Sequence, residues 1–419
     1  VNRYDEIKTK KLRVIKVKDG KNFKKQAQRM VLDVPKEDFM RYLIRSKSVL
    51  DCRSKIQSIE SSGSLKMNIQ VIDTRFTIPA STLVLLDYYR IFDEIQQYKN
   101  EKSYFNISID RNKLKPILET DGWYELIIPE KQLEIDSIRK IDYATDYAIM
   151  ALKSYMDKFC KFEQERWEAP LLEFQEISAT DNNFVDEYTF TVTPQNSLDT
   201  TGEELDKFIG DIKSILADNN GLNEYEKKFD FNKNLCLFDF RSHLYAPLVC
   251  LKKGNTNIQI TPVSLNEDEK LFVDYLKEFT ENNGDVLENK SLYLLRNKSK
   301  AGMGFFVAGN FYPDYILWID TPEKQYITFV DPKGLLRIMP DDPKIEFYKT
   351  IKDLEKQLAP TAGDKQIVLN SFIMSATKSA DLHEWWHWDK ATREAHNVYT
   401  LDDDQCVVSM INKICLLQS

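Results

Sequence analysis

The second half of the chain alternates between apolar runs at helical spacing and short runs rich in β-branched and aromatic residues. We predict a helix over 265–282, with Ser264 and Glu267 forming the capping box at its start. Short β-type runs follow at 292–296 and 305–307. The other elements expected in this half are a helix that starts near Pro340 and Pro343 and ends near Gln357, a buried strand at 366–374, and helices at 381–388 and 405–416.

Two further apolar runs, Tyr315–Ile319 and Tyr326–Val330, flank a turn-like segment at 320–324 and predict a β-hairpin. Asp314 precedes the first strand and Asp331 follows the second. Because antiparallel pairing brings the start of one strand beside the end of the next, we expect these two carboxylates to meet. The resulting order is α-β-β-β-α-β, with acids on the second and third strands.

The first half mixes short β-type runs with helical segments. Apolar residues recur every three or four positions across 138–164, which predicts a long, well-buried helix. A polar stretch from Pro194 to Gly202 indicates a domain boundary near residue 195, so the expected domains are 1–195 and 196–419. The other elements expected here are strands at 67–72 and 104–109 and helices at 81–98 and 202–219.

Composition limits the class of protein. The chain has 419 residues, of which 42% are hydrophobic, as in ordinary globular proteins of two or three domains. It contains no apolar run of roughly eighteen residues and no signal peptide, so we expect a cytoplasmic protein without a membrane span. The chain begins with Val1, which indicates a processed chain or a fragment of a longer one.

The cysteines predict a reduced protein. They are scattered and form no CxxC pair, which is typical of core residues and not of a disulfide framework or a zinc site. The six are Cys52, Cys160, Cys236, Cys250, Cys406 and Cys415.

Charge adds one local feature. The formal net charge is −8, which argues against a protein covered in positive charge for nucleic acid. The opening segment is nevertheless basic, and the alternation over 12–18 predicts a strand whose outer face either contacts nucleic acid or is simply solvated. Its basic residues are Lys8, Lys10, Lys11, Arg13, Lys16, Lys18, Lys21, Lys24, Lys25 and Arg29.

Candidate chemistry centres on the hairpin. Asp331 and Lys333 are two positions apart and therefore point to the same face of a strand. Two carboxylates suit Mg²⁺, which takes oxygen ligands and keeps several waters. Such an ion neutralises phosphate charge and makes its bound water easier to deprotonate, while Lys333 orients that water or stabilises charge on phosphorus oxygens. The alternative is a surface hairpin with solvated charges.

A second motif has metal-ligand spacing. His383 and His387 flank Glu384-Trp385-Trp386, which is the HExxH spacing of zinc-protease helices. Such a site needs a third ligand, and His396 follows in no matching motif. Solvated or core histidines are therefore the favoured interpretation, with a metalloprotease as the competing one.

The motif Pro313-Asp314…Asp331-Pro332-Lys333 and the order of elements resemble the PD-(D/E)xK nuclease fold, a central mixed sheet flanked by helices. Segments 262–273 and 311–316 are similar to the C-terminal region of type III restriction enzyme nuclease subunits and related helicase–nuclease proteins. Stretches 155–168 and 183–188 resemble the linker that follows the helicase core there. The resemblance spans most of residues 140–375.

The resemblance implies a role for each matching residue. Asp314 would be the central metal ligand and Asp331 the second, in a position where relatives often carry Glu. Pro332 would offer its carbonyl to the ion, and Lys333 would be the catalytic lysine. A proline here also removes a backbone donor, so we expect this strand end to lie at an edge or a bulge.

The fold usually adds an acid from the first helix. Glu269 is our choice for that acid, with Asp268 as the alternative, because Glu267 is taken as the capping-box residue. Nearby residues that would approach or hold a DNA backbone, or else serve turns and the solvated surface, are Gly302, Gly304, Gly309, Arg296, Lys298, Lys300 and Arg337.

The function implied is Mg²⁺- or Mn²⁺-dependent hydrolysis of DNA phosphodiester bonds by the endonuclease module of a restriction or antiviral helicase–nuclease. Residues 1–195 would be the helicase-associated accessory region, and 196–419 the nuclease domain. The implied partners are DNA, a helicase motor in the same full-length chain or complex, and a methyltransferase or specificity subunit. This chain has no GxxxxGK[ST] loop, so no ATP hydrolysis is predicted for it. The alternative is a catalytically silent nuclease-like scaffold that binds DNA or partner subunits.

Overall fold

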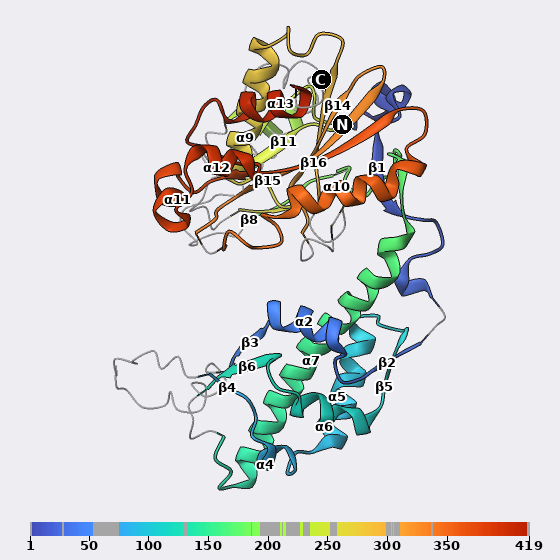
Figure 1. Cartoon of the computed structure of the whole chain (residues 1–419), viewed down its shortest axis with the longest axis vertical. Coiled ribbons are helices and arrows are strands. Elements are labelled where there is room, and N and C mark those ends of the chain that lie inside the picture. Colours follow the sequence, from blue (N-terminus) through green and yellow to red (C-terminus); the bar gives the residue numbers. More distant parts are fainter. Residues whose placement is uncertain are drawn as a thin grey trace. The chain divides into compact units, whose positions relative to one another are not determined.

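The structure is a computed structural model, and it divides the chain into two compact units (Figure 1). One, here called the sheet unit, comprises Val1–Lys16 and Leu172–Ser419. The other, the helical unit, comprises Val17–Leu171. The described residues are 2–26, 29–52, 75–128, 133–185, 187–192, 210–211, 213–214, 227–228, 235–251, 258–298, 303, 305, 311–336 and 338–416.

This division differs from the boundary expected near residue 195. Strand β7 (Leu172–Glu176) pairs with β1 (Arg13–Val17), and the Ile177 N–H donates to the Leu12 carbonyl over 2.8 Å. The segment after residue 171 is therefore tied to the chain's opening residues. The polar stretch at 193–200, which suggested the boundary, lies outside the described residues.

The helical unit is built around one long helix. Helix α7 (Ile138–Glu168) confirms the prediction at 138–164, and it packs against α2, α5, α6 and β3 (Figure 1). Its core is separate from that of the sheet unit. The other helices here are η2 (Phe23–Lys25), α2 (Glu37–Arg45), α4 (Ala80–Leu83), α5 (Tyr88–Glu101), α6 (Arg111–Glu119) and η4 (Ala169–Leu171); the strands are β2 (Met30–Leu32), β3 (Ser48–Asp51), β4 (Arg75–Phe76), β5 (Ile107–Ile109) and β6 (Tyr124–Ile127).

Two predictions in this unit need correction, and a third concerns residues that the structure does not describe. The helix expected over 81–98 is broken, because the Asp87 side chain caps a new helix by accepting from the N–H groups of Tyr89 and Arg90. The strand expected at 104–109 is shorter and begins at Ile107. The strand expected at 67–72 lies outside the described residues.

The sheet unit contains a five-stranded mixed sheet in the order β13-β14-β15-β16-β17. The first two pairings are antiparallel, and those of β15 with β16 and β16 with β17 are parallel. Every residue of β14 is buried, as expected of a strand covered on both faces. The strands are β13 (Ser291–Arg296), β14 (Tyr315–Asp320), β15 (Lys324–Lys333), β16 (Gln366–Ser375) and β17 (Val398–Thr400).

Helices cover this sheet. Helices α9 (Glu267–Asn282) and α13 (Cys406–Leu416) contact each other and the strands, while α10 (Phe347–Leu358) packs on β16 at the other side (Figure 1). The mixed α/β class and the order α9-β13-β14-β15-α10-β16 agree with the prediction. Smaller elements of the unit are α1 (Tyr4–Ile7), η1 (Lys8–Lys10), β8 (Thr189–Val192), β9 (Lys227–Lys228), β10 (Leu235–Phe238), β11 (Leu248–Leu251), β12 (Ile258–Thr261), η5 (Ala359–Thr361), α11 (Ser379–Trp386) and α12 (Lys390–Ala395).

The hairpin has the predicted register. Tyr315 pairs with Val330 and Asp320 with Gln325, and the Thr321 hydroxyl accepts from the Lys324 N–H over 2.9 Å to close the turn. The strand expected at 305–307 is not formed by the described part, where Phe305 makes only an isolated bridge to Phe311. The helix expected at 202–219 lies mostly outside the described residues.

The capping box predicted for α9 is wrong by two residues. The N-cap is Asn266, whose side chain accepts from the N–H groups of Asp268 and Glu269, while the Glu269 carboxylate accepts from the Asn266 N–H over 2.8 Å. Leu265 is held extended beside β11 by a bond from its N–H to the Val249 carbonyl. The helix therefore cannot begin earlier. No helix within the described residues is long and apolar enough to cross a membrane.

Candidate functional site

The hairpin brings Asp314 and Asp331 together. Asp331 lies in β15, beside Ile373 of β16, and is 3% exposed. Asp314 immediately precedes β14, so extending the pairing of Tyr315 with Val330 by one step places it opposite Asp331. The two carboxyl groups lie within hydrogen-bonding contact.

This contact has a strong electrostatic consequence. Burial, followed by the negative charges of Asp331 and Glu269, raises the pKa of Asp314 to about 8. Burial also raises the pKa of Asp331, against the opposing effect of Lys333. The two groups titrate as a pair, and at neutral pH they share a proton. A proton shared between adjacent acids occupies the place that a divalent cation can take.

Two lysines face this acid pair. The Lys333 ammonium donates to the Asp331 carboxylate over 3.3 Å, and its side chain is about one-third exposed. Lys344 is close enough to interact with Asp331 and Lys333, and burial followed by the charge of Lys333 lowers the pKa of Lys344. We call Asp314, Asp331, Lys333 and Lys344 the acid–lysine site.

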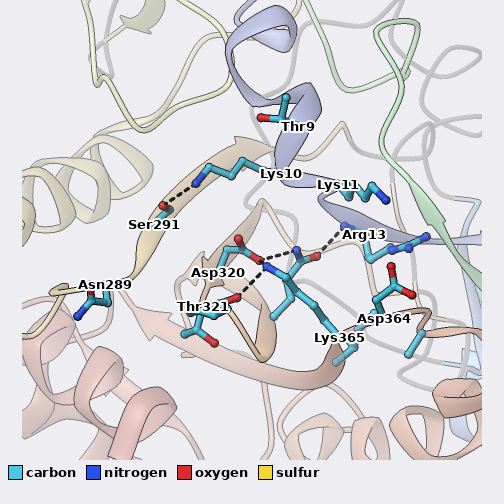
Figure 2. Close-up of a pocket in the computed structure, with 14 residues that line it drawn as sticks. Thr9, Lys10, Lys11, Arg13, Asn289, Ser291, Asp320, Thr321, Asp364 and Lys365 are labelled. Atoms are coloured by element: carbon cyan, nitrogen blue, oxygen red, sulfur yellow. Dashed lines mark hydrogen bonds and ion pairs between the residues drawn. The ribbon is translucent and has the colours of Figure 1, made fainter.

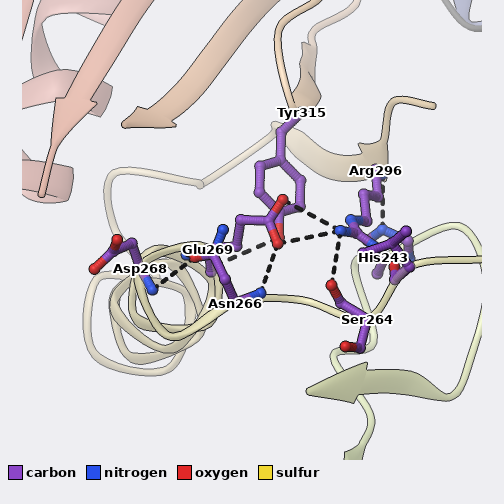
Figure 3. A network of polar contacts seen from close by, with 8 residues as sticks. His243, Ser264, Asn266, Asp268, Glu269, Arg296 and Tyr315 are labelled. Carbon is purple, nitrogen blue, oxygen red and sulfur yellow. Dashed lines mark hydrogen bonds and ion pairs between the residues drawn. The ribbon is translucent and has the colours of Figure 1, made fainter. Parts of the chain in front are cut away.

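Glu269 lies behind this site, but its carboxylate already has partners. It accepts from the Asn266 N–H and forms an ion pair with Arg296 at 3.1 Å (Figure 3). Its charge still raises the pKa of Asp314, so it is near the acid pair. The alternatives lie elsewhere on the first turn: Asp268 is half-buried and Glu267 is exposed.

Arg296 is half-buried, and its guanidinium is engaged by protein acceptors. It therefore does not offer its charge to a DNA phosphate, which was one of the two roles considered for it. Its guanidinium also donates to the Ser264 carbonyl over 3.1 Å and to the Val263 carbonyl. Its backbone N–H donates to Nε2 of His243 over 2.9 Å, so Glu269, Arg296 and His243 belong to one network of polar contacts (Figure 3).

His243 is fully buried and was not singled out in the sequence. Because Nε2 accepts from Arg296, we assign the proton to Nδ1, which donates to the Tyr245 carbonyl over 2.9 Å. Burial lowers the pKa of His243 to about 3, so the ring is neutral. The histidine fixes the segment before β11 against the end of β13.

Pro332 lies near the end of β15, the central strand of the sheet. Pro332 pairs with Met374 of β16, and β15 continues to Lys333. The pairing with β14 ends at Val330, so no strand of the ladder lies on that side of Pro332. The end of β15 is therefore a local edge on the β14 side, as expected, and the missing N–H is tolerated there.

The histidine motif does not form one helical face. Helix α11 ends at Trp386, and His387 takes a left-handed φ of 56°, so His383 and His387 do not continue one helix. Both rings are exposed. His396 lies elsewhere, with Nδ1 bonded to the Thr392 carbonyl and its ring against Trp388.

Several of the remaining candidates already have protein partners, and others are residues that the structure does not describe. The Lys298 ammonium donates to the Phe184 carbonyl over 2.9 Å. Lys16 forms an ion pair with Asp181 at 2.6 Å, and Arg13 with Glu176 at 3.6 Å. The positions outside the described residues are Gly302, Gly304, Gly309, Lys300 and Arg337.

The donor set fits a hard divalent ion in part. Within the described residues, no group of three or more His, Cys, Asp or Glu side chains is placed to hold a metal. Asp314 and Asp331 supply two carboxylates, and Mg²⁺ is commonly held by one or two carboxylates with water. The Pro332 carbonyl is adjacent in sequence. A cation between the two acids would relieve the repulsion that, after burial, raises the pKa of Asp314.

Sequence reasoning missed Lys344 and His243. Lys344 follows the hairpin by eleven residues and reaches the site only through tertiary packing. The Asp341-Asp342-Pro343 turn before it carried no recognisable motif. His243 stands next to the apolar Leu244-Tyr245, which suggested burial at most.

Comparison with protein-family models, with curated proteins and with solved structures found no match for this chain.

Proposed function

We propose that the sheet unit is a Mg²⁺- or Mn²⁺-dependent DNA endonuclease module of the PD-(D/E)xK type. The observation that carries the proposal is the contact of Asp314 with Asp331 at the open end of a buried hairpin, with Lys333 bonded to Asp331. Two acids and an amine so arranged suit phosphodiester hydrolysis. The type III restriction setting, the helicase motor and the methyltransferase or specificity subunit are the wider part of this proposal.

Each residue then has a definable task. Bound Mg²⁺ would supply charge neutralisation of the phosphate and activation of water, with Asp314, Asp331 and the Pro332 carbonyl as its protein ligands. Lys333 and Lys344 place positive charge beside the acids, where it favours a bound phosphate and stabilises charge that develops during hydrolysis. Arg296 fixes the start of α9 through Glu269 and so holds the surroundings of Asp314 in place.

Removing either acid should abolish cleavage. We expect Asp314→Ala and Asp331→Asn to lower the rate of plasmid cleavage with Mg²⁺ or Mn²⁺ by at least about 100-fold, since each loses a metal ligand. Lys333→Ala should cause a loss of about 100-fold without abolishing Mn²⁺ binding. Cleavage is measured by conversion of supercoiled DNA, and Mn²⁺ binding by titration calorimetry.

The matched control is Asp353→Asn, which removes an exposed aspartate on α10 that pairs with Lys356. It should cleave and bind Mn²⁺ like the wild type. Wild-type activity that survives Asp314→Ala would refute the site. Plasmid cleavage is also measured with the motor-containing assembly, because a motor can license cutting.

One observation favours the alternative, a scaffold that does not cut. Glu269, the acid expected from the first helix, is bound by Arg296 and Asn266. In that case the protein should bind DNA or partner subunits without Mg²⁺, and Asp331→Asn should not alter that binding. Fluorescence anisotropy with labelled duplex DNA in EDTA, together with absent cleavage in the complete assembly, would establish the scaffold.

A further inference from the structure

A polar pocket lies at the turn end of the hairpin, at the opposite end of its strands from the acid–lysine site (Figure 2). It is a cavity of about 320 Å³, in the size range of small-molecule sites. Its walls come from the opening segment, the start of β13, the hairpin turn and the loop before β16. We call it the hairpin-turn pocket.

The floor of the pocket is a row across four strands. Ser291 pairs with Asp320, Asp320 with Gln325, and Gln325 with Ile367. Because these positions are in register, the row is fixed by the ladder of the sheet. The pocket is thus built on the rigid part of the unit.

The acid in the floor is already neutralised. Asp320 is 6% exposed, and it accepts from the Lys365 ammonium over 2.7 Å and from the Gln325 amide over 3.0 Å. The Gln325 side-chain oxygen accepts from the Arg13 backbone N–H over 2.7 Å. Lys365 also donates to the Thr321 carbonyl. These contacts neutralise the Asp320 carboxylate, so the cations of the opening segment remain for a ligand.

Three cations of the opening segment line the other wall. Lys10 donates to the Ser291 hydroxyl over 3.4 Å, and within the described residues neither Lys10 nor Lys11 forms an ion pair with an acid. Arg13 shares its charge with Glu176 at 3.6 Å, a long contact to a half-exposed carboxylate. With Lys365, Asp320 and the exposed Asp364 included, the lining carries a formal charge of +2.

Backbone geometry holds this wall in place. Lys11 takes a left-handed φ of 49°, which non-glycine residues adopt rarely. Gly363 has a φ of +79°, and a Cβ there would lie 2.7 Å from Nη2 of Arg13. The guanidinium therefore rests against the glycine backbone at the rim of the pocket.

The ligand class follows from charge and from the apolar part of the lining. The apolar lining residues are Pro322, Ala362 and Ile367. Among the described residues, no aromatic ring lines the pocket to stack on a nucleobase. A lining charge of +2 in a protein of net charge −8 suits a compact dianion. A phosphomonoester carries about −1.5 to −2 near neutral pH and accepts several charge-assisted hydrogen bonds.

We propose that the hairpin-turn pocket binds a phosphomonoester or inorganic phosphate dianion through Lys10, Lys11 and Arg13. The site needs no divalent ion and lies at the other end of β14 and β15 from Asp314 and Asp331. It therefore stands whether or not the acid–lysine site cuts DNA.

The test is a calorimetric titration of the full chain with inorganic phosphate, in EDTA at pH 8 and low ionic strength. We expect one site in the wild type, and Lys11→Glu should raise Kd at least about tenfold, corresponding to about 1.4 kcal/mol. Lys11→Gly, which suits the left-handed backbone, should weaken binding without strain. The matched control is Lys8→Glu, which changes an exposed residue of the same segment paired with Asp5.

Two outcomes would overturn the proposal: no phosphate binding by the wild type, or equal weakening by Lys8→Glu and Lys11→Glu. Competition between phosphate and a short oligonucleotide, with or without a 5′-phosphate, identifies the source of the ligand. Displacement by the 5′-phosphorylated form alone supports the pocket with nucleic-acid ends as the source. Displacement by neither form, with phosphate still bound, supports it with a small molecule.

Discussion

Replacing Arg296 with methionine should lower the free energy of unfolding of the sheet unit by about 3–5 kcal/mol, the range for breaking a buried ion pair on one side. The variant leaves the Glu269 carboxylate, 5% exposed, without its cation. It also removes the donor that serves the carbonyls of Val263 and Ser264. The measurement is urea unfolding followed by near-ultraviolet circular dichroism.

The control is Lys356→Met, which removes a cation from the exposed pair with Asp353 in the same unit. It should change stability by less than about 1 kcal/mol. A double variant, Glu269→Gln with Arg296→Met, should recover part of the loss, because no unpaired charge stays buried. Equal losses in Arg296→Met and Lys356→Met would show that the buried pair has no special role.

Acid should destabilise the protein through His243. The folded state keeps this ring neutral down to a pKa of about 3, because burial and the charges of Arg3 and Arg296 disfavour the imidazolium. An unfolded chain protonates histidine near its ordinary pKa of 6.5. The unfolded state therefore binds more protons between those values, and stability falls by up to about 1.4 kcal/mol per pH unit as pH drops through this window.

His243→Asn should lose this part of the pH dependence. Asparagine keeps a donor and an acceptor but does not titrate, so the variant is less stable at pH 7 and its curve is flatter between pH 6.5 and 3 than that of the wild type. His383→Asn, at an exposed histidine of the same unit, should follow the wild type. Parallel curves for His243→Asn and the wild type would contradict the neutral assignment of His243.

Much of the sheet unit was predictable because its signals are local. The apolar runs at Tyr315–Ile319 and Tyr326–Val330 and the turn between them fix both strands and their register. The contact of Asp314 with Asp331 follows from that register alone. Helix α7 was equally clear, since its apolar stripe continues over many turns.

The start of α9 was not predictable, because two overlapping boxes satisfy the same pattern. Ser264 with Glu267 and Asn266 with Glu269 are both polar caps followed three residues later by Glu. The bridge between Cys250 and Leu265 decides between them by keeping Leu265 extended. The position of the N-cap therefore depends on β11, which precedes the helix by more than a dozen residues. It also makes Glu269 the acid of the capping box.

Lys344 and His243 show the same limit for the site. Each reaches its partners through tertiary contacts across eleven or more residues, and neither sits in a pattern that names a chemistry. Arg296 was noticed as a charge, but only the structure reveals its ion pair with Glu269. A sequence indicates which charges exist, whereas their partners depend on packing.

The pairing of β1 with β7 has a structural consequence for the rest of the chain. The chain leaves the sheet unit after Lys16 and returns at Leu172, and the Lys18 N–H donates to the Leu171 carbonyl over 2.9 Å. Residues 17–171 therefore form a domain inserted between the neighbouring strands β1 and β7. An inserted domain of this kind can be gained, lost or exchanged at the short connection between β1 and β7 while the pairing of these two strands stays intact.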